Sequence, residues 1–441
     1  MSIKTRRFIF YSFTLLFLLA SVLIIQNSRG FNFDFASFSF NETGGIYISS
    51  IPTDAEILLN DAAVKNQSGL LQRGTLITNL VPDVHELLVT REGYRKWKKN
   101  PVVLPETVTT FDSVVLVPDI SPELFIDQVV SDFSILGDEQ IIFQNNNGVW
   151  INDEQVLGHR IVDNKRNGIA LTKSITTDNY YLVNAFTLQN QLNVTLVFNN
   201  LKESVLDLPG EVDLSKAALI GDGREMILST ERAIYYLDTD DLGIDLITSD
   251  TNEFSIQEDD LVTYINNEGT VMVYDPKTNN STTLKFSEET SEFGSYKKIR
   301  LSATGTFLLT DNNELYLYST NLEKIAEDIV DFYLSPGGEQ IAMIRGNSSI
   351  SIYRKKRNET KIIDIGSFEG NFSQLEWYRD YAHLLVRTDN KLYFWEIDKE
   401  APISKELISE DARTFHYDGD ADLIYIATSK NLSTFDMSPS L

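Results

Sequence analysis

The stretch FYLSPGGEQIAMIRGNSSISIYR, residues 332–354, alternates short apolar runs with residues that favour turns. Pro336-Gly337-Gly338 separates the first run from QIAMI, and Gly346 to Ser349 separates QIAMI from ISIYR. Short runs of β-branched and aromatic residues, bounded by Gly, Pro, Asn and Ser, are typical of strands joined by tight turns. The stretch therefore predicts a unit of strand, turn, strand, hairpin and strand.

The same unit recurs along the rest of the chain. Its third strand, which usually ends in a polar residue, is found as VWIND (149–153), VTLVF (194–198), IYYLD (234–238), VMVYD (271–275), LYLYS (315–319), ISIYR (350–354), LYFWE (392–396) and LSTFD (432–436). The starts lie 45, 40, 37, 44, 35, 42 and 40 residues apart. A period of about forty is that of one four-stranded blade of a β-propeller.

Such a sheet cannot bury both of its faces alone, so neighbouring units must stack in a ring. The last unit stops after its third strand, and Leu124 to Val130, LFIDQVV, could supply the missing fourth strand and close the ring. The sequence thus favours an eight-bladed propeller over residues 119–441, with seven blades as the alternative because the second unit is irregular.

One unit also carries a family resemblance. Phe332 to Ala342 resembles the F-S-P-D-G-x-x-I-A element of propellers related to the Tol-system periplasmic protein, a repeat that also precedes the hydrolase domain of prolyl oligopeptidases. Only this unit matches well, so the resemblance implies an architecture rather than an activity. We expect no hydrolase domain after the propeller.

Residues 44–118 read as shorter strands with alternating apolar residues and predict a small β-sandwich. They resemble the PEGA domain, a β module of bacterial and archaeal surface proteins, in Ser50-Ile-Pro-Thr-Asp-Ala-Glu-Ile57, Leu80-Val-Pro-Asp-Val-His-Glu-Leu87 and Glu92-Gly-Tyr-Arg-Lys-Trp97. Asp54, Asp61 and Asp83 stand where that family has glycine, and aspartate tolerates positive φ better than most residues. The resemblance implies a fold and transfers no catalytic residue.

The N-terminus predicts a membrane helix. Phe8 to Ile25 is an uncharged run of 18 residues, about 27 Å of helix against a hydrocarbon core of ~30 Å. The basic residues Lys4, Arg6 and Arg7 precede it, so residues 1–7 are expected in the cytoplasm and residues 30–441 outside it, at the cell surface or in the periplasm. A cleaved signal peptide is the alternative, disfavoured because no small-x-small site follows the run.

Residues 26–43 are expected to be a juxtamembrane linker that contains FNFDFASFSF (31–40). Its phenylalanine rings would rest in the membrane interface, or the segment would be a strand that docks on the first domain.

A basic patch stands out in a chain of net charge −26. It comprises Arg91, Tyr94, Arg95, Lys96, Trp97, Lys98 and Lys99. The patch could contact an anionic envelope polymer or lipid headgroups. The alternative, which we favour, is that Tyr94 and Trp97 fill the small core while the cations stay solvated.

Several chemistries have no support in the sequence. The chain has no cysteine, no G-x-S-x-G or H-E-x-x-H motif and no Walker-type loop, and its acidity disfavours nucleic acid. His85, His159, His383 and His416 are expected to be structural. The Asp-rich stretches 238–243 and 418–422 could hold calcium, but hairpin turns explain them better. No catalytic, cofactor or metal residue is therefore assigned.

Together these features predict an all-β cell-envelope protein, held in the cytoplasmic membrane or its outer leaflet by one helix. Its PEGA-like domain and propeller would bind a protein or polymer of the envelope. The enzyme alternative is a propeller hydrolase or lyase that acts on an envelope glycan through channel carboxylates. A sensor is a third possibility, although a seven-residue tail leaves little room for signalling.

Overall fold

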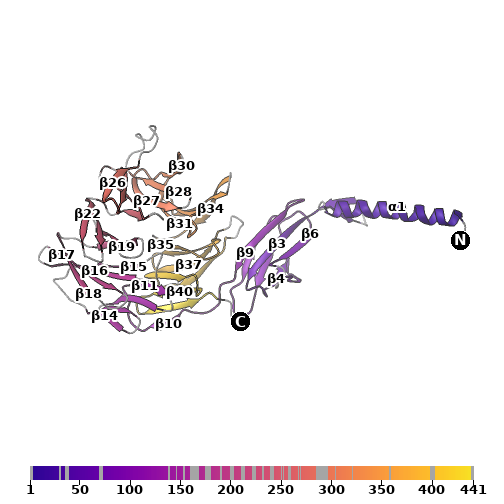
Figure 1. Ribbon diagram of the computed structural model, residues 1–441. Coiled ribbons are helices and arrows are strands. Elements are labelled where there is room, and N and C mark those ends of the chain that lie inside the picture. The colour runs from indigo at the N-terminus through magenta and orange to yellow at the C-terminus, as the bar shows by residue number, and fades with distance from the viewer. Residues whose placement is uncertain are drawn as a thin grey trace.

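The computed structural model describes residues 3–28, 31–34, 39–68, 73–137, 140–145, 147–151, 154–158, 168–173, 180–188, 191–198, 203–209, 214–220, 225–230, 233–238, 243–249, 251, 253–256, 260–266, 268, 270–284, 296–302, 304–319, 321–356, 359–397 and 403–438. Between residues 151 and 217 the description covers the backbone of the strands alone. Within these ranges the fold is one N-terminal helix followed by β-structure throughout (Figure 1).

Helix α1 (Ile3–Ser28) projects away from the β body (Figure 1). Its window Thr5–Val22 is long and apolar enough to cross a membrane, and none of that window is buried against the rest of the protein. Thr14 and Ser21 donate to the carbonyl oxygens of Phe10 and Phe17, so both hydroxyls are satisfied inside the helix. The helix could be a membrane anchor or a signal sequence.

The linker predicted for residues 26–43 contains a β-hairpin. Strand β1 (Phe31–Asp34) pairs antiparallel with β2 (Ser39–Glu42), with Phe33 opposite Phe40. The hairpin pairs with itself and adds no strand to the module that follows. The phenylalanine side chains of this segment lie outside the described residues.

Residues 44–118 form two sheets, and we call this part the N-terminal module. One sheet has the order β6-β3-β9 and the other β5-β4-β7-β8. Their strands are β3 (Gly44–Ile51), β4 (Glu56–Leu59), β5 (Ala62–Val64), β6 (Thr75–Leu80), β7 (Leu87–Thr90), β8 (Trp97–Lys99) and β9 (Val108–Val115). Ile46 and Ile48 of one sheet pack in a common core with Val89 and Trp97 of the other, which makes the predicted sandwich.

The positive φ expected where aspartate replaces glycine is confirmed at one position. Asp61 has a φ of 63°, which aspartate tolerates better than most residues. Asp54 and Asp83 are not among the described residues with positive φ, so the expectation was wrong there. These turns do not need glycine.

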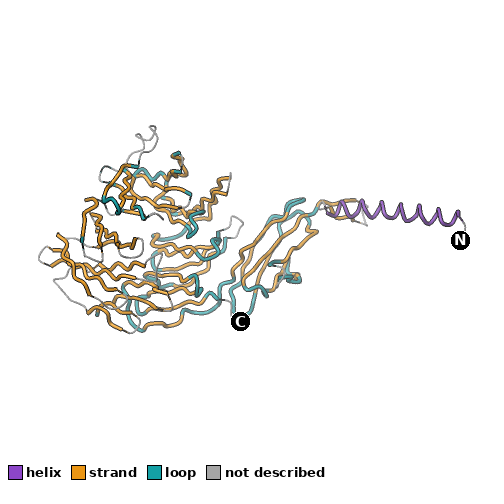
Figure 2. Tube along the Cα trace, viewed as in Figure 1, coloured by secondary structure: helices purple, strands orange, loops and turns teal. Residues whose placement is uncertain are grey.

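The rest of the chain forms eight four-stranded antiparallel sheets, which we call blades 1 to 8 in chain order (Figures 1 and 2). Blades 1 to 4 are β11 (Asp132–Gly137), β12 (Gln140–Asn145), β13 (Gly148–Ile151), β14 (Glu154–Gly158); β15 (Gly168–Lys173), β16 (Tyr180–Leu188), β17 (Gln191–Phe198), β18 (Glu203–Pro209); β19 (Leu214–Ile220), β20 (Glu225–Thr230), β21 (Ala233–Asp238), β22 (Ile244–Ser249); and β23 (Phe254–Ile256), β24 (Val262–Ile265), β25 (Val271–Asp275), β26 (Asn280–Thr283).

Blades 5 to 8 follow the same plan. They are β27 (Tyr296–Ser302), β28 (Gly305–Thr310), β29 (Leu315–Tyr318), β30 (Leu322–Ala326); β31 (Ile329–Leu334), β32 (Gln340–Arg345), β33 (Ser349–Lys356), β34 (Glu359–Ser367); β35 (Phe372–Trp377), β36 (His383–Thr388), β37 (Lys391–Glu396), β38 (Lys405–Ser409); and β39 (Thr414–Asp418), β40 (Leu423–Ala427), β41 (Leu432–Asp436), with β10 (Glu123–Ile126).

The eighth blade closes the ring as predicted. Strand β10 comes before blade 1 in the chain but pairs antiparallel with β41, with Glu123 opposite Thr434. The eight-bladed prediction is confirmed, and the irregular second unit also forms a four-stranded sheet.

The blades of the propeller share their apolar cores with their neighbours. The described core clusters each combine side chains of two consecutive blades: 3 with 4, 4 with 5, 5 with 6, 6 with 7, 7 with 8, and 8 with 1. In these six pairs of blades, the apolar face of one sheet is removed from water by the neighbouring sheet, which is the main stabilising term of such a fold.

We expect Phe435→Ala to destabilise the propeller strongly. Phe435 on β41 is fully buried between blades 7 and 8, so its loss should cost about 3–5 kcal/mol of unfolding free energy. The exposed Leu124 on β10 is the control, because Leu124→Ala should change that free energy by no more than about 0.5 kcal/mol. Urea denaturation of both variants measures the difference, and equal shifts would contradict the packing described here.

Candidate functional site

The first strands of blades 5 to 8 place polar side chains at alternate positions. Lys298 and Arg300 stand on β27, Tyr333 on β31, Glu376 on β35 and His416 on β39. The alternating neighbours Ile299, Phe332, Leu375 and Phe415 are buried between blades. Because side chains alternate along a strand, the polar side chains lie on the opposite face of each sheet from these buried neighbours, beside the central channel of the ring.

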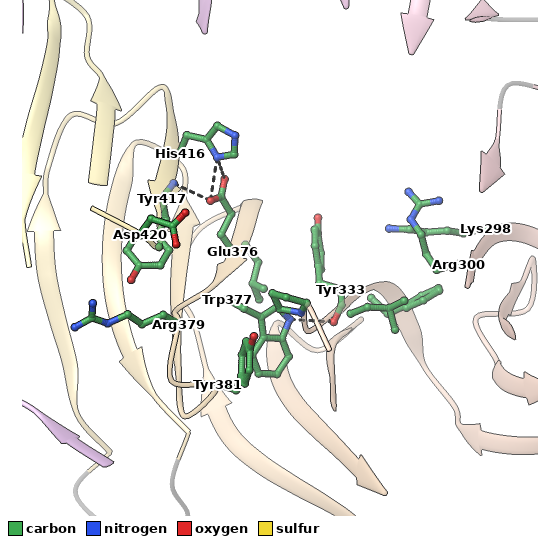
Figure 3. Close-up of a pocket in the computed structure, with 15 residues that line it drawn as sticks. Lys298, Arg300, Tyr333, Glu376, Trp377, Arg379, Tyr381, His416, Tyr417 and Asp420 are labelled. Atoms are coloured by element: carbon green, nitrogen blue, oxygen red, sulfur yellow. Dashed lines mark hydrogen bonds and ion pairs between the residues drawn. The ribbon is translucent and has the colours of Figure 1, made fainter. Parts of the chain in front are cut away.

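These strands enclose a cavity of about 760 Å³, which we call the channel pocket (Figure 3). Its lining is Lys298, Arg300, Phe332, Tyr333, Leu334, Pro336, Leu375, Glu376, Trp377, Arg379, Tyr381, His416, Tyr417, Gly419 and Asp420. Clefts of roughly 300–1,000 Å³ that combine rings with a few polar groups are the usual form of ligand sites.

The mouth of the pocket is made by turns between the first and second strands. The turn after Leu334 is held by Gly338 N–H, which donates to Ser335 O at 2.7 Å, and by Gln340 N–H, which donates to Ser335 Oγ at 3.1 Å. This is the S-P-G-G element that was singled out in the sequence, and its Pro336 lines the mouth. A motif predicted only for architecture therefore also shapes the candidate site.

Two cations on one side of the pocket are paired but remain at its surface. Lys298 Nζ donates to Asp331 Oδ1 of the next blade and lies 4.9 Å from the centre of the Tyr333 ring. Burial lowers the pKa of Lys298, and the charge of Asp331 opposes that shift. Arg300 Nη1 donates to Glu253 Oε2 at 3.1 Å.

On the opposite side, Glu376 joins blade 7 to blade 8 (Figure 3). Its carboxylate accepts from the backbone N–H of Tyr417 at 2.9 Å and lies 3.1 Å from His416 Nδ1. Gln374 Nε2 donates to it at 3.1 Å and to Phe415 O at 2.7 Å. These three partners hold the carboxylate of Glu376 in a fixed position.

A buried carboxylate contacts two residues of the pocket lining, Arg379 and Tyr417. Asp422 is almost fully buried and accepts from Tyr378 Oη at 3.1 Å and Tyr417 Oη at 2.9 Å, while Arg379 Nη2 lies 2.8 Å from it. Burial, and then the charge of Asp422, raises the pKa of both tyrosines, so both donate as neutral phenols. This arrangement fixes Arg379 at the rim of the pocket.

The channel pocket was not predicted from the sequence. His416 was expected to be structural, but it lines the cavity beside Glu376. The signal that could have found the site is the alternation of polar and apolar residues in KKIR, QLE and FHY, the first strands of three blades. A single chain does not reveal that these strands meet in one channel.

The other histidines form local contacts. His383 is buried, with Nδ1 2.7 Å from Asp380 Oδ2, and His85 lies between Asn60 and Val81 O at 2.9 and 2.8 Å. His159 lies outside the described residues.

No group of three or more acidic or histidine side chains is placed to hold a metal ion among the described residues. In the stretch 418–422, Asp418 Oδ1 instead accepts from the N–H groups of Asp420 and Ala421 at 3.0 and 3.2 Å, as in a turn. The stretch 238–243 lies largely outside the described residues.

The basic patch divides between two environments. Of its seven residues, Tyr94, Trp97 and Lys99 are buried, Arg91 and Arg95 are half-buried, and Lys96 and Lys98 are exposed. Tyr94 and Trp97 lie in the core of the module as expected, but Lys99 does not stay solvated, which was wrong. Contact of this patch with an envelope polymer stays a prediction, with Lys96 and Lys98 as its exposed cations.

Lys99 is buried because it binds the propeller. Its Nζ lies 2.9 Å from Glu396 Oε2 at the end of β37, and Trp97 Nε1 donates to both oxygens of the same carboxylate at 3.3 Å. Arg95 Nη1 donates to Leu407 O at 2.5 Å. We call this contact the junction.

Apolar side chains complete the junction. Val115 at the end of β9 and Val117 just after it pack into the core cluster between blades 7 and 8. An ion pair withdrawn from water and a shared apolar cluster therefore connect the module to the propeller.

Comparisons with known proteins give little guidance. No protein-family model matches the chain, and a search of curated proteins finds no match. Among solved structures, a chain in a crystal structure of a mitotic checkpoint complex is similar with a TM-score of 0.43 and 11% identity, covering 62% of this chain and 90% of that one. A similarity of this size supports no functional argument, and the PEGA and Tol-type resemblances stay predictions.

We expect Lys99→Met to destabilise the junction by about 3–5 kcal/mol, because it leaves the Glu396 carboxylate buried without its cation. The double variant Lys99→Met/Glu396→Gln should recover most of that loss, since glutamine is neutral and can still accept from Trp97. Chemical denaturation of the two single variants and the double variant gives the coupling energy. Additive losses would show that the pair is not coupled.

Proposed function

We propose that this protein is a membrane-anchored binding protein of the cell envelope, in which α1 is retained and the propeller lies outside the cytoplasm. The observation that carries the binding role is the channel pocket, which combines rings with cations. The N-terminal module, proposed to be a PEGA-type domain, connects the anchor to the propeller.

The environment of α1 supports the anchor. No residue of the window Thr5–Val22 is buried against the part of the chain that the structure describes, so this apolar helix is exposed along its length. A bilayer would remove it from water, and the bias of basic residues toward its N-terminal end favours a cytoplasmic N-terminus.

The composition of the pocket supports an anionic, ring-stacking partner. Arg300 and Arg379 can donate to carboxylates or phosphates, and Tyr381 presents an exposed ring at the mouth. A segment of an acidic envelope polysaccharide offers both a flat sugar face and anionic groups. A peptide with acidic and aromatic residues is the alternative partner.

The topology can be tested by labelling, because the chain contains no cysteine. We expect Lys96→Cys, at an exposed position of the module, to react with a small membrane-impermeant maleimide on intact cells. Ser2→Cys should react only after permeabilisation. The reverse pattern would invert the proposed orientation, and a mature chain that lacks residues 8–25 in mass spectrometry would identify a cleaved signal peptide.

The pocket can be tested with defined polymers. We expect the full chain in detergent to bind polygalacturonate more tightly than neutral dextran, and Arg300→Ala to weaken binding about tenfold through loss of a charged hydrogen bond. Arg413→Ala is the control, because Arg413 is exposed on the propeller and does not line the pocket. Equal affinity of the two variants would contradict the proposed site.

The same experiment distinguishes a binding protein from the second candidate function, a polymer hydrolase or lyase. Glu376 and Asp420 line one cavity, which is the observation that favours a hydrolase or lyase. Release of new chain ends from the polymer by the wild type, lost in Glu376→Gln, would favour that enzyme over a binding protein.

A further inference from the structure

One end of the N-terminal module exposes aliphatic side chains that face no other described part of the protein. Val81, Val84, Val102, Leu104 and Val108 are 67%, 58%, 49%, 55% and 51% exposed. They come from the segments that follow β6 and β8 and from the start of β9. We call these five residues the apolar rim.

Ordered backbone presents the apolar rim. Val84 and Val102 form an isolated antiparallel bridge, His85 N–H donates to Pro101 O at 3.0 Å, and Val103 N–H donates to Asp83 O at 2.9 Å. The ring of His85 holds the same loop through Val81 O at 2.8 Å. The side chains are therefore exposed by a fixed structure, and gathered exposed apolar side chains of this kind mark interaction surfaces.

The apolar rim lies at the end of the module that faces α1. Strand β3 begins at Gly44, which pairs with Leu80, and Gly45 pairs with Val108. This end of the module is the one next to the helix in Figure 1. The rim and the helix therefore share one side of the β body.

The hairpin β1-β2 keeps the two close. Phe31 follows Ser28 by three residues, and its partner in the hairpin, Glu42, precedes Gly44 by two. From the end of α1, this path advances three residues, crosses to the partner strand and advances two more residues. It spans at most about 22 Å, so Gly44 lies within that distance of the end of α1. The hairpin thus keeps the module closer to α1 than a fully extended linker of 15 residues would.

We propose that the apolar rim rests in the headgroup layer of the same bilayer that α1 crosses. This inference rests on the proposed anchor. A lipid surface fits the rim because shallow burial of aliphatic side chains between headgroups removes them from water without a matching protein groove. The occupant is thus the membrane, and a partner protein on this surface is an outcome that the test can detect.

The charges around the apolar rim indicate which lipids it suits. Asp61, Asp83 and Glu106 are exposed in the adjoining turns, and the nearby Lys98 is already paired with Glu86 at 2.9 Å. Carboxylates at this position are repelled by anionic lipids. A zwitterionic surface such as phosphatidylcholine is therefore the probe of choice.

The apolar rim can be tested by labelling single cysteines, because the chain has none of its own, and the propeller offers matched control positions. Val84→Cys and Val102→Cys place one thiol each on the rim, whereas Leu246→Cys and Val330→Cys place one on the propeller at sites that are also 58% and 49% exposed. Each full-length variant is labelled with an environment-sensitive dye and reconstituted into phosphatidylcholine vesicles with or without lipid-borne spin label. Only protein that floats with the vesicles is measured.

We expect the rim dyes to shift to shorter wavelength in vesicles and to lose emission in the presence of the spin-labelled lipid, while the two propeller dyes do neither. Rim dyes that respond no more than the propeller dyes in floating protein would overturn the proposal. A blue shift without quenching by the lipid would also overturn it, because it would show a protein occupant. Failure of all variants to float would instead refute the anchor, so the two failures are distinguishable.

Discussion

Every blade of the propeller depends on a neighbour to cover its apolar faces, and the ring can satisfy all eight only if it closes. Closure is made by β10, which precedes blade 1 in the chain and pairs with β41 at the other end. The pairing joins sequence positions about 310 residues apart. It therefore makes the propeller one cooperative unit rather than a row of separable hairpins.

The same closure positions the N-terminal module. The chain passes directly from β9 into β10, so the strand that closes the ring is joined to the strand that ends the module. Val115 and Val117 on this path pack in the cluster that also contains Phe435 of β41. The ion pair of Lys99 with Glu396 is then brought together by elements whose positions are already set.

Those features of the fold that depend on a local sequence pattern could be predicted from the sequence. Third strands such as IYYLD and LYFWE alternate apolar residues between turn residues. The blade count follows from that repeat, and so does the closing strand, which was predicted at 124–130 and is found at Glu123–Ile126. The channel pocket and the burial of Lys99 were not predicted, because each depends on residues far apart in the chain. Glu396 lies 297 positions after Lys99, and nothing around Lys99 distinguishes it from a solvated lysine.

The strand order also determines which way the pocket faces. In an antiparallel blade, the turn between the first and second strands lies at the same edge as the turn between the third and fourth. The pocket mouth uses the first kind of turn, at Pro336 and Tyr381. The junction uses the two strands that the second kind of turn joins, at Glu396 on β37 and Leu407 on β38. Ile397 N–H donates to Ala382 O at 2.8 Å, which joins the two kinds of turn directly. The mouth therefore opens on the face that carries the module, which is the face toward the membrane if α1 is an anchor as proposed.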